Sequence, residues 1–135
     1  QPDAGWIRAK LSQDLRERYQ LSIVSWKLAV ASTDPVAMKA AGYVTTQREK
    51  HWYDRHAAEM SVEQIVRGGT PVIVTMRPGF GENTSIHAII LLSWDENGVE
   101  IIDPDARNER THYSPFEISA AMSPVGAASV VLPKL

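Results

Sequence analysis

The sequence contains no cysteine, carries almost no net charge and has no long hydrophobic run. The missing cysteine excludes disulfides, thiolate zinc sites and, in the sequence as it stands, a thiol nucleophile. The 14 Lys and Arg against 16 Asp and Glu leave a formal net charge of −2, so no basic excess favours nucleic acid or an anionic membrane as a partner. The longest apolar stretch, residues 86–92, is far shorter than the roughly 18 apolar residues of a membrane helix.

The composition that remains predicts a single domain over residues 1–135. A hydrophobic fraction of 44% with so little net charge argues against disorder. A chain of this length buries roughly two-thirds of its unfolded surface without a metal or disulfide. Gln1 opens the chain without an initiator Met or a signal segment, so we expect a processed product or a piece of a longer polypeptide, and its localisation stays open.

The first half of the sequence reads as helical. Apolar residues at steps of four predict an amphipathic helix over residues 4–19. Residues 22–31 are apolar nearly all round, which predicts a buried helix with Ser22 as its N-cap. A short helix is expected over residues 35–41, and a loop followed by a helix near residues 56–60.

The second half changes to strands. Two capping boxes predict helices after Ser61 and Ser114, the first ending at a glycine pair and the second near residue 122. The predicted strands are residues 71–77, 86–94, 99–102 and 128–132. Because helices come first and strands later, the expected class is α+β, with N-terminal helices packed on an antiparallel sheet.

One pair of polar residues is brought together by this topology. His87 stands at the start of a strand that is apolar on both faces and is therefore expected at the centre of the sheet. Asp103 follows the next strand, and Asn97-Gly98 between the two strands favours a tight hairpin. The start of one hairpin strand lies beside the end of the other, so we expect His87 and Asp103 to be within side-chain reach.

Two residues near the predicted buried helix complete a candidate catalytic set. Ser25 near a helix N-terminus is placed where the macrodipole favours an ionised nucleophile. A His serves as general base for such a group, and an Asp fixes the His tautomer and stabilises the imidazolium. The amide of Gln20 can donate to a developing oxyanion.

These residues resemble the papain-like cysteine peptidases, in particular the compact bacterial branches that include bacteriocin-leader peptidase-like domains and secreted effector peptidases. The resemblance covers residues 20–132: Gln20 ahead of Ser25-Trp26, the strand at residues 69–74, the His-strand at residues 87–92, and the strand that ends in Asp103-Pro104. It implies a papain-like α+β fold and peptide-bond hydrolysis through an acyl-enzyme. The effector branch further implies secretion or delivery by a bacterium.

The resemblance assigns a role to each candidate. Ser25 takes the nucleophile position, His87 is general base and acid, and Asp103 orients His87. Gln20 and the backbone N–H of Ser25 form the oxyanion hole. No cofactor is implied, and the partner is a peptide or protein substrate. The same acyl-enzyme serves transpeptidation and deamidation.

The sequence departs from the family at the nucleophile, where the family has Cys and this chain has Ser25. An alternative register puts Ser22 at that position, although Trp26 after Ser25 favours Ser25. Three explanations stay open: an engineered Cys→Ser substitution, which we favour; a natural loss of activity, which would leave a catalytically silent peptide-binding domain; and a working Ser-His-Asp hydrolase.

Two other features carry weaker signals. His51 and His56 lie near Asp54 and Glu59, but five residues on a helix correspond to about 140° of rotation, so a shared metal is disfavoured. The glycine-rich residues 78–85 follow a strand without opening a helix and fit no phosphate-binding pattern. We expect this segment to be a mobile flap that borders His87 and lines a substrate cleft.

Overall fold

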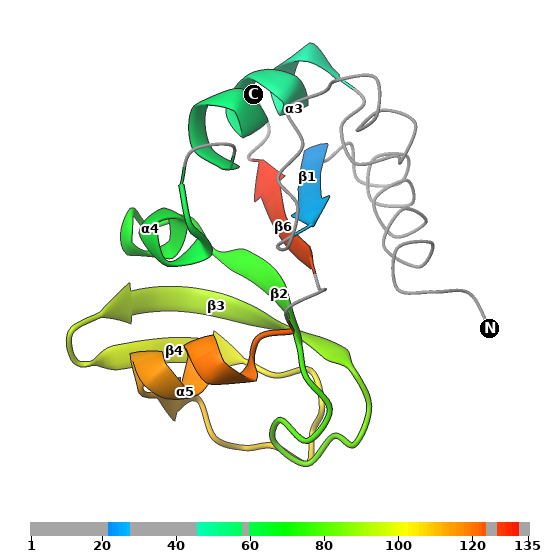
Figure 1. Cartoon of the computed structure of the whole chain (residues 1–135), viewed down its shortest axis with the longest axis vertical. Coiled ribbons are helices and arrows are strands. Elements are labelled where there is room, and N and C mark those ends of the chain that lie inside the picture. Colours follow the sequence, from blue (N-terminus) through cyan, green and yellow to red (C-terminus); the bar gives the residue numbers. More distant parts are fainter. Residues whose placement is uncertain (1–21, 28–45, 58–59, 124–126, 133–135) are drawn as a thin grey trace.

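The computed structural model describes residues 22–27, 46–57, 60–123 and 127–132 (Figure 1). These residues form a six-stranded antiparallel open sheet with short helices, so the predicted α+β class is confirmed. The sheet has the order β1-β6-β2-β3-β4-β5. Its strands are β1 (Ser22–Lys27), β2 (Val72–Met76), β3 (His87–Asp95), β4 (Gly98–Ile102), β5 (His112–Tyr113) and β6 (Ala127–Leu132). The helices are α3 (Gln47–Trp52), α4 (Val62–Arg67) and α5 (Pro115–Ala121), and the π-helical segment η1 (Tyr53–Ala57) follows α3 directly.

The elements predicted in the second half are confirmed. Ser61 and Ser114 each form a complete capping box at the start of α4 and α5. Strands β2, β3, β4 and β6 lie where they were expected, and in this half only the short β5 was not predicted. Gly98 has a φ of 143°, a backbone conformation that L side chains rarely adopt, which explains why the turn between β3 and β4 has a glycine.

The helix predicted over residues 22–31 is wrong over residues 22–27, which form β1. A short run that is apolar on both sides fits a buried strand as well as a buried helix. Ile23, Val24 and Trp26 are β-branched or aromatic and suit a strand. The deciding partner is β6, more than one hundred residues away, which pairs with all six residues of β1. The residues near β1 in the sequence therefore do not predict this pairing.

The helix expected near residues 56–60 begins earlier, at Gln47. Thr46 and Glu49 form a capping box that the sequence-based prediction did not include. Glu49 is fully buried, and its carboxylate also accepts a hydrogen bond of 3.1 Å from the backbone N–H of Ile23. This bond ties α3 to β1, and it satisfies a backbone donor on a strand at the end of the sheet.

One face of the sheet holds the hydrophobic core. His87, Ile89 and Leu91 of β3 lie opposite Met76, Val74 and Val72 of β2, and all of these except His87 are buried. Helices α4 and α5 contact β3 and β4, and Figure 1 shows α5 lying over β4. The strand β3 is internal to the sheet, as predicted. Its other face is more open, since Leu92 is 40% exposed.

Several predictions fall on residues that lie outside the described ranges. These are the helices over residues 4–19 and 35–41, the packing of N-terminal helices on the sheet, and the position of Gln20. The single-domain organisation and the papain-like fold remain predictions. In the described ranges no helix has the length and apolar character needed to cross a membrane.

Candidate functional site

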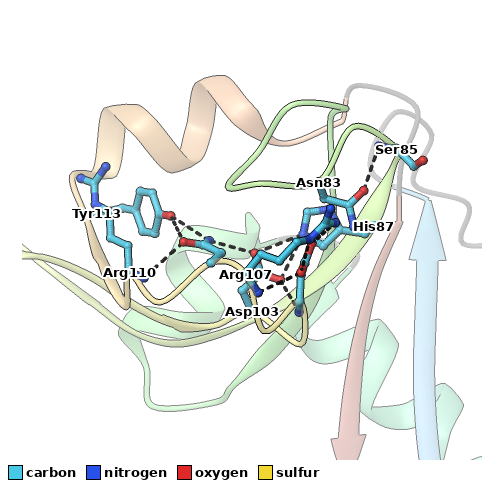
Figure 2. A network of polar contacts seen from close by, with 9 residues as sticks. Asn83, Ser85, His87, Asp103, Arg107, Arg110 and Tyr113 are labelled. Carbon is cyan, nitrogen blue, oxygen red and sulfur yellow. Dashed lines mark hydrogen bonds and ion pairs between the residues drawn. The ribbon is translucent and has the colours of Figure 1, made fainter.

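The predicted contact between His87 and Asp103 is present at the end of the β3–β4 hairpin (Figure 2). His87 begins β3, and Asp103 follows the last residue of β4. The Nε2 atom of His87 lies 3.2 Å from each carboxylate oxygen of Asp103. The two strands pair antiparallel, which brings the start of one beside the end of the other. The contact therefore follows from the hairpin geometry, as the sequence indicated.

Asp103 is held as a carboxylate by several donors. Its side chain is fully buried and accepts hydrogen bonds of 2.9 Å from Asn108 Nδ2 and from the backbone N–H of Asp105. Burial acts to raise the pKa of Asp103. The hydrogen bonds from Asn108, Asp105 and His87, with the charge attraction of His87, outweigh it and lower this pKa below its ordinary value of 3.8. Asp103 is thus ionised at neutral pH.

This contact also determines which nitrogen of His87 is available for proton transfer. A carboxylate only accepts hydrogen bonds, so Nε2 carries the hydrogen and Nδ1 of the neutral ring carries the lone pair. Nδ1 is buried and has no hydrogen-bond partner within the described part of the chain. Unpaired buried nitrogens are uncommon because desolvation without a partner is unfavourable. His87 therefore presents a base nitrogen that no described protein group occupies.

Two residues that the sequence-based prediction missed, Asn108 and Tyr113, extend this network, and Asn108 contacts Asp103 directly. Asn108 Nδ2, which donates to Asp103, also lies 3.0 Å from the Tyr113 hydroxyl. Tyr113 is buried, and Figure 2 shows its hydroxyl directed along the same network toward Asp103. A chain of contacts thus runs from Tyr113 through Asn108 and Asp103 to His87.

The sequence does carry a signal for this loop. Asp103, Asp105 and Asn108 each accept a hydrogen bond from the backbone N–H two residues further on, which is the pattern of successive Asx turns. The side chain of Arg107 folds back on Asp105 at 2.6 Å and lowers the pKa of that carboxyl to about 2. The spacing of Asp and Asn residues was therefore a readable sign that residues 103–110 form a tight, ordered loop.

Ser25 lies away from His87. It is directly opposite Ser129, whose partner on β2 is Ile73, and Ile73 in turn lies opposite Ile90 of β3. These three strand spacings amount to roughly 14 Å. Residues that lie directly opposite share a face, so Ser25 is on the face of Ile90. His87 is three positions from Ile90 and points to the other face.

The surroundings of Ser25 are those of a structural hydroxyl. The side chain is buried, with 1% of the residue exposed, and its Oγ lies 2.6 Å from Oγ of Ser129. Ser22 shares a face with His87 but lies opposite Leu132, at the far end of β6 from the end nearest His87. The structure thus brings together His87 and Asp103, and it does not bring Ser25 or Ser22 to them.

The segment predicted to be a flap borders His87. The ring of Phe80 lies 6.0 Å from that of His87 and 5.0 Å from that of Tyr113. Gly81 has a φ of 60° and lies against Asn108, where an added Cβ would be 2.6 Å from Nδ2. This segment therefore lies beside the network at three points: the Phe80 ring is near His87 and Tyr113, and the backbone of Gly81 is near Asn108.

The described residues contain no group of three or more His, Asp or Glu side chains suited to a metal ion. His56 instead stacks on Trp52 with ring centroids 4.7 Å apart, and its Nδ1 lies 3.0 Å from the carbonyl oxygen of Trp52.

Comparison of the chain with protein-family models, with curated proteins and with solved structures found no match. The function is therefore inferred from the residues of this chain.

Proposed function

We propose that this protein is a papain-like peptidase domain that acts on a peptide or protein chain, with His87 as general base and acid and Asp103 as its orienting group. The observation that carries the proposal is the lone pair of His87 Nδ1. It is buried without a partner among the described residues, while Asp103 occupies the other ring nitrogen. A histidine with a purely structural role would be expected to use both nitrogens.

The chemistry follows from this tautomer. Nδ1 takes the proton of the attacking group as that group adds to the peptide carbonyl, and the ring becomes imidazolium. The carboxylate of Asp103 stabilises the new charge. Nδ1 then gives its proton to the leaving amine as the peptide C–N bond breaks, which leaves an acyl-enzyme. A water molecule then loses a proton to Nδ1 as its oxygen adds to the acyl carbon. The bond between that carbon and the nucleophile breaks, Nδ1 returns the proton to the nucleophile, and the peptide acid leaves, which restores the starting state.

The nucleophile is the part of the proposal that the described arrangement does not support. Ser25 holds the family's Cys position, yet its hydroxyl pairs with Ser129 on the opposite face of the sheet from His87. A general base acts within about 3 Å of the proton it takes, or through one water. For Ser25 to be the nucleophile, residues 22–27 must therefore leave their pairing with β6.

That same observation favours a second candidate, a catalytically silent domain that binds a peptide without cutting it. In this alternative, Ser25 is a native structural residue and His87 with Asp103 is the retained half of a lost active site.

Alkylation of an introduced cysteine separates the two candidates. Ser25→Cys is treated with iodoacetamide across a pH range, alone and combined with His87→Ala. Ser129→Cys is a matched control, since Ser129 is a similarly buried residue of the same pair. The peptidase predicts that the thiol of Ser25→Cys reacts quickly below the free-thiol pKa of about 8.5 and that His87→Ala removes this reactivity. The silent domain predicts that both introduced thiols react slowly and without regard to His87.

Cleavage of an unfolded protein, followed by mass spectrometry, tests the reaction itself. The peptidase predicts that Ser25→Cys produces peptide fragments and that adding His87→Ala lowers the rate by about 10²–10⁴-fold. Absence of fragments from Ser25→Cys would refute the peptidase. Labelling of Ser25 in the unsubstituted chain by a fluorophosphonate probe would instead identify a Ser-His-Asp hydrolase.

A further inference from the structure

A cavity of about 470 Å³ lies between the segment after β2 and helix α5. Its size is that of pockets that bind small molecules or single side chains. It is adjacent to the His87–Asp103 pair, because Phe80 forms part of its wall and also faces the His87 ring at 6.0 Å. The residues that matter for its chemistry are Arg77, Phe80, Tyr113, Phe116, Glu117 and Ala121.

The aromatic wall of this cavity has both a rigid and an exposed part. Phe80 and Tyr113 are buried, with ring centroids 5.0 Å apart, so their positions are determined by packing. Phe116 is 81% exposed. The capping box of Ser114 and the proline at position 115 define where α5 begins, and they place this exposed ring at the mouth of the cavity. A large exposed aromatic at a concave apolar site is typical of a binding surface.

The charge at the cavity is positive. Glu117 is neutralised by Arg110, whose Nη2 lies 2.9 Å from its carboxylate. Arg77 donates its Nε–H to the carbonyl oxygen of Met122 at 3.1 Å, and none of the carboxylates in the ranges that the structure describes forms an ion pair with it. The Arg77 side chain is thus anchored at one nitrogen, and its remaining N–H groups suit a carboxylate.

We propose that this cavity binds a large apolar side chain of a peptide that carries a carboxylate next to it, with the ring or alkyl group against Phe80, Tyr113 and Phe116 and the carboxylate on Arg77. The identification of this peptide as the substrate rests on the proposed function. Phe80 lines the cavity and its ring centroid lies 6.0 Å from that of His87, so the bond that is cut lies about two or three residues along the extended chain from the bound side chain. The carboxylate can be a chain terminus or an acidic side chain.

Binding is measured by NMR titration of the unsubstituted chain with four probes. N-acetyl-phenylalanine carries a terminal carboxylate, and N-acetyl-aspartyl-phenylalaninamide carries a side-chain carboxylate. N-acetyl-phenylalaninamide is neutral, and N-acetylglycine has a carboxylate without a ring. At least one of the two aromatic carboxylates is expected to shift the resonances of Phe116 and Phe80 at millimolar concentration. It is expected to bind about five-fold more tightly than the neutral amide. Whichever of the two binds more tightly identifies the source of the carboxylate.

Three variants test the assigned contacts. Arg77→Gln is expected to abolish the preference for carboxylate while leaving the weaker binding of the amide. Phe116→Ala, a change at an exposed side chain, is expected to weaken all aromatic probes. Arg67→Gln removes an arginine that already pairs with Glu63 on α4 and is expected to change nothing. Circular dichroism of each variant verifies that the fold is retained.

Failure of both aromatic carboxylate probes to bind at about 10 mM would overturn this proposal. So would a result in which neither of them binds more tightly than N-acetyl-phenylalaninamide. The titration requires no turnover, so its result is independent of the cleavage assay. Binding without cleavage would refute the proposed peptidase activity and support the cavity as a peptide-binding site. Cleavage without binding at the cavity would refute the proposed peptide site and support the peptidase activity.

Discussion

Two pairs of polar side chains link neighbouring strands, yet they differ in what they leave unpaired. Ser25 and Ser129 are both buried and lie 2.6 Å apart, so each hydroxyl has a partner in the other. His87 and Asp103 also contact one another, but Nδ1 of His87 has no partner among the described residues. The serine pair thus completes the packing of β1 on β6, whereas the His–Asp pair retains a nitrogen that can accept a proton.

The difference shows why residue type alone is a poor guide to a nucleophile. The proposed function gives Ser25 the nucleophile position, yet in the structure Ser25 is buried and its hydroxyl pairs with that of Ser129. Asp103, by contrast, is held by Asn108, by a backbone N–H and by His87. The density of directed hydrogen bonds around a side chain distinguishes the candidate reactive pair from the structural one.

The largest effect is expected from Asp103→Ala. The substitution leaves three donors without an acceptor, on His87, Asn108 and the Asp105 backbone, in a buried position. We expect it to lower the free energy of unfolding by about 3 kcal/mol in urea at pH 7. Asp54→Ala, which removes an exposed ion pair with Lys50, is the control and should change stability by less than about 0.5 kcal/mol. Equal effects of the two substitutions would show that Asp103 is not held as described.

Ser25→Ala is expected to lower the free energy of unfolding by about 1–2 kcal/mol, because it leaves the hydroxyl of Ser129 buried without its partner. The double variant Ser25→Ala with Ser129→Ala removes both hydroxyls. It should therefore be destabilised by less than the sum of the two single changes, in a double-mutant cycle followed by urea unfolding. Additive effects would mean that the two serines do not interact.

Two glycines of the segment after β2 offer a matched comparison. Gly79 and Gly81 both have positive φ, so alanine is strained at either position. A Cβ at position 79 meets nothing within 4 Å, whereas one at position 81 would be 2.6 Å from Asn108 Nδ2. We expect Gly81→Ala to be more destabilising than Gly79→Ala by about 1 kcal/mol, because it also displaces Asn108 from Asp103. A carbon-13 titration of the Asp103 carboxyl should show a raised pKa in Gly81→Ala alone.

The smallest expected effect is that of Asn108→Ala on how the free energy of unfolding depends on pH in acid. The folded-state pKa of Asp103 is lowered, so its ionised form stabilises the fold above pH 3.8, and this stabilisation is lost as the pH falls through the folded-state pKa. Asn108→Ala removes a hydrogen bond to the carboxylate and lets this pKa rise. The free energy of unfolding should then fall less steeply between pH 4 and pH 2, by about 0.5–1 kcal/mol in total. An unchanged slope would mean that Asn108 does not hold Asp103 in its ionised form.

How far the sequence could predict this structure differs between its two halves. The capping boxes after Ser61 and Ser114, the strands and the Asn97-Gly98 hairpin are local patterns. They predicted the elements of residues 61–132 apart from β5, together with the His87–Asp103 contact. Each of these depends on residues close in sequence. Asn108 was missed although the Asp and Asn spacing of its loop is also a local signal.

The tertiary structure alone decided what residues 22–27 form. Their apolar run suits a buried helix or a buried strand, and only the pairing with β6 selects the strand. In a strand, side chains alternate between faces, and Ser25 faces away from His87. The α+β class and the histidine–aspartate pair were thus determined by local sequence. The separation of Ser25 from that pair came from a pairing between the two ends of the described chain, which no local pattern encodes.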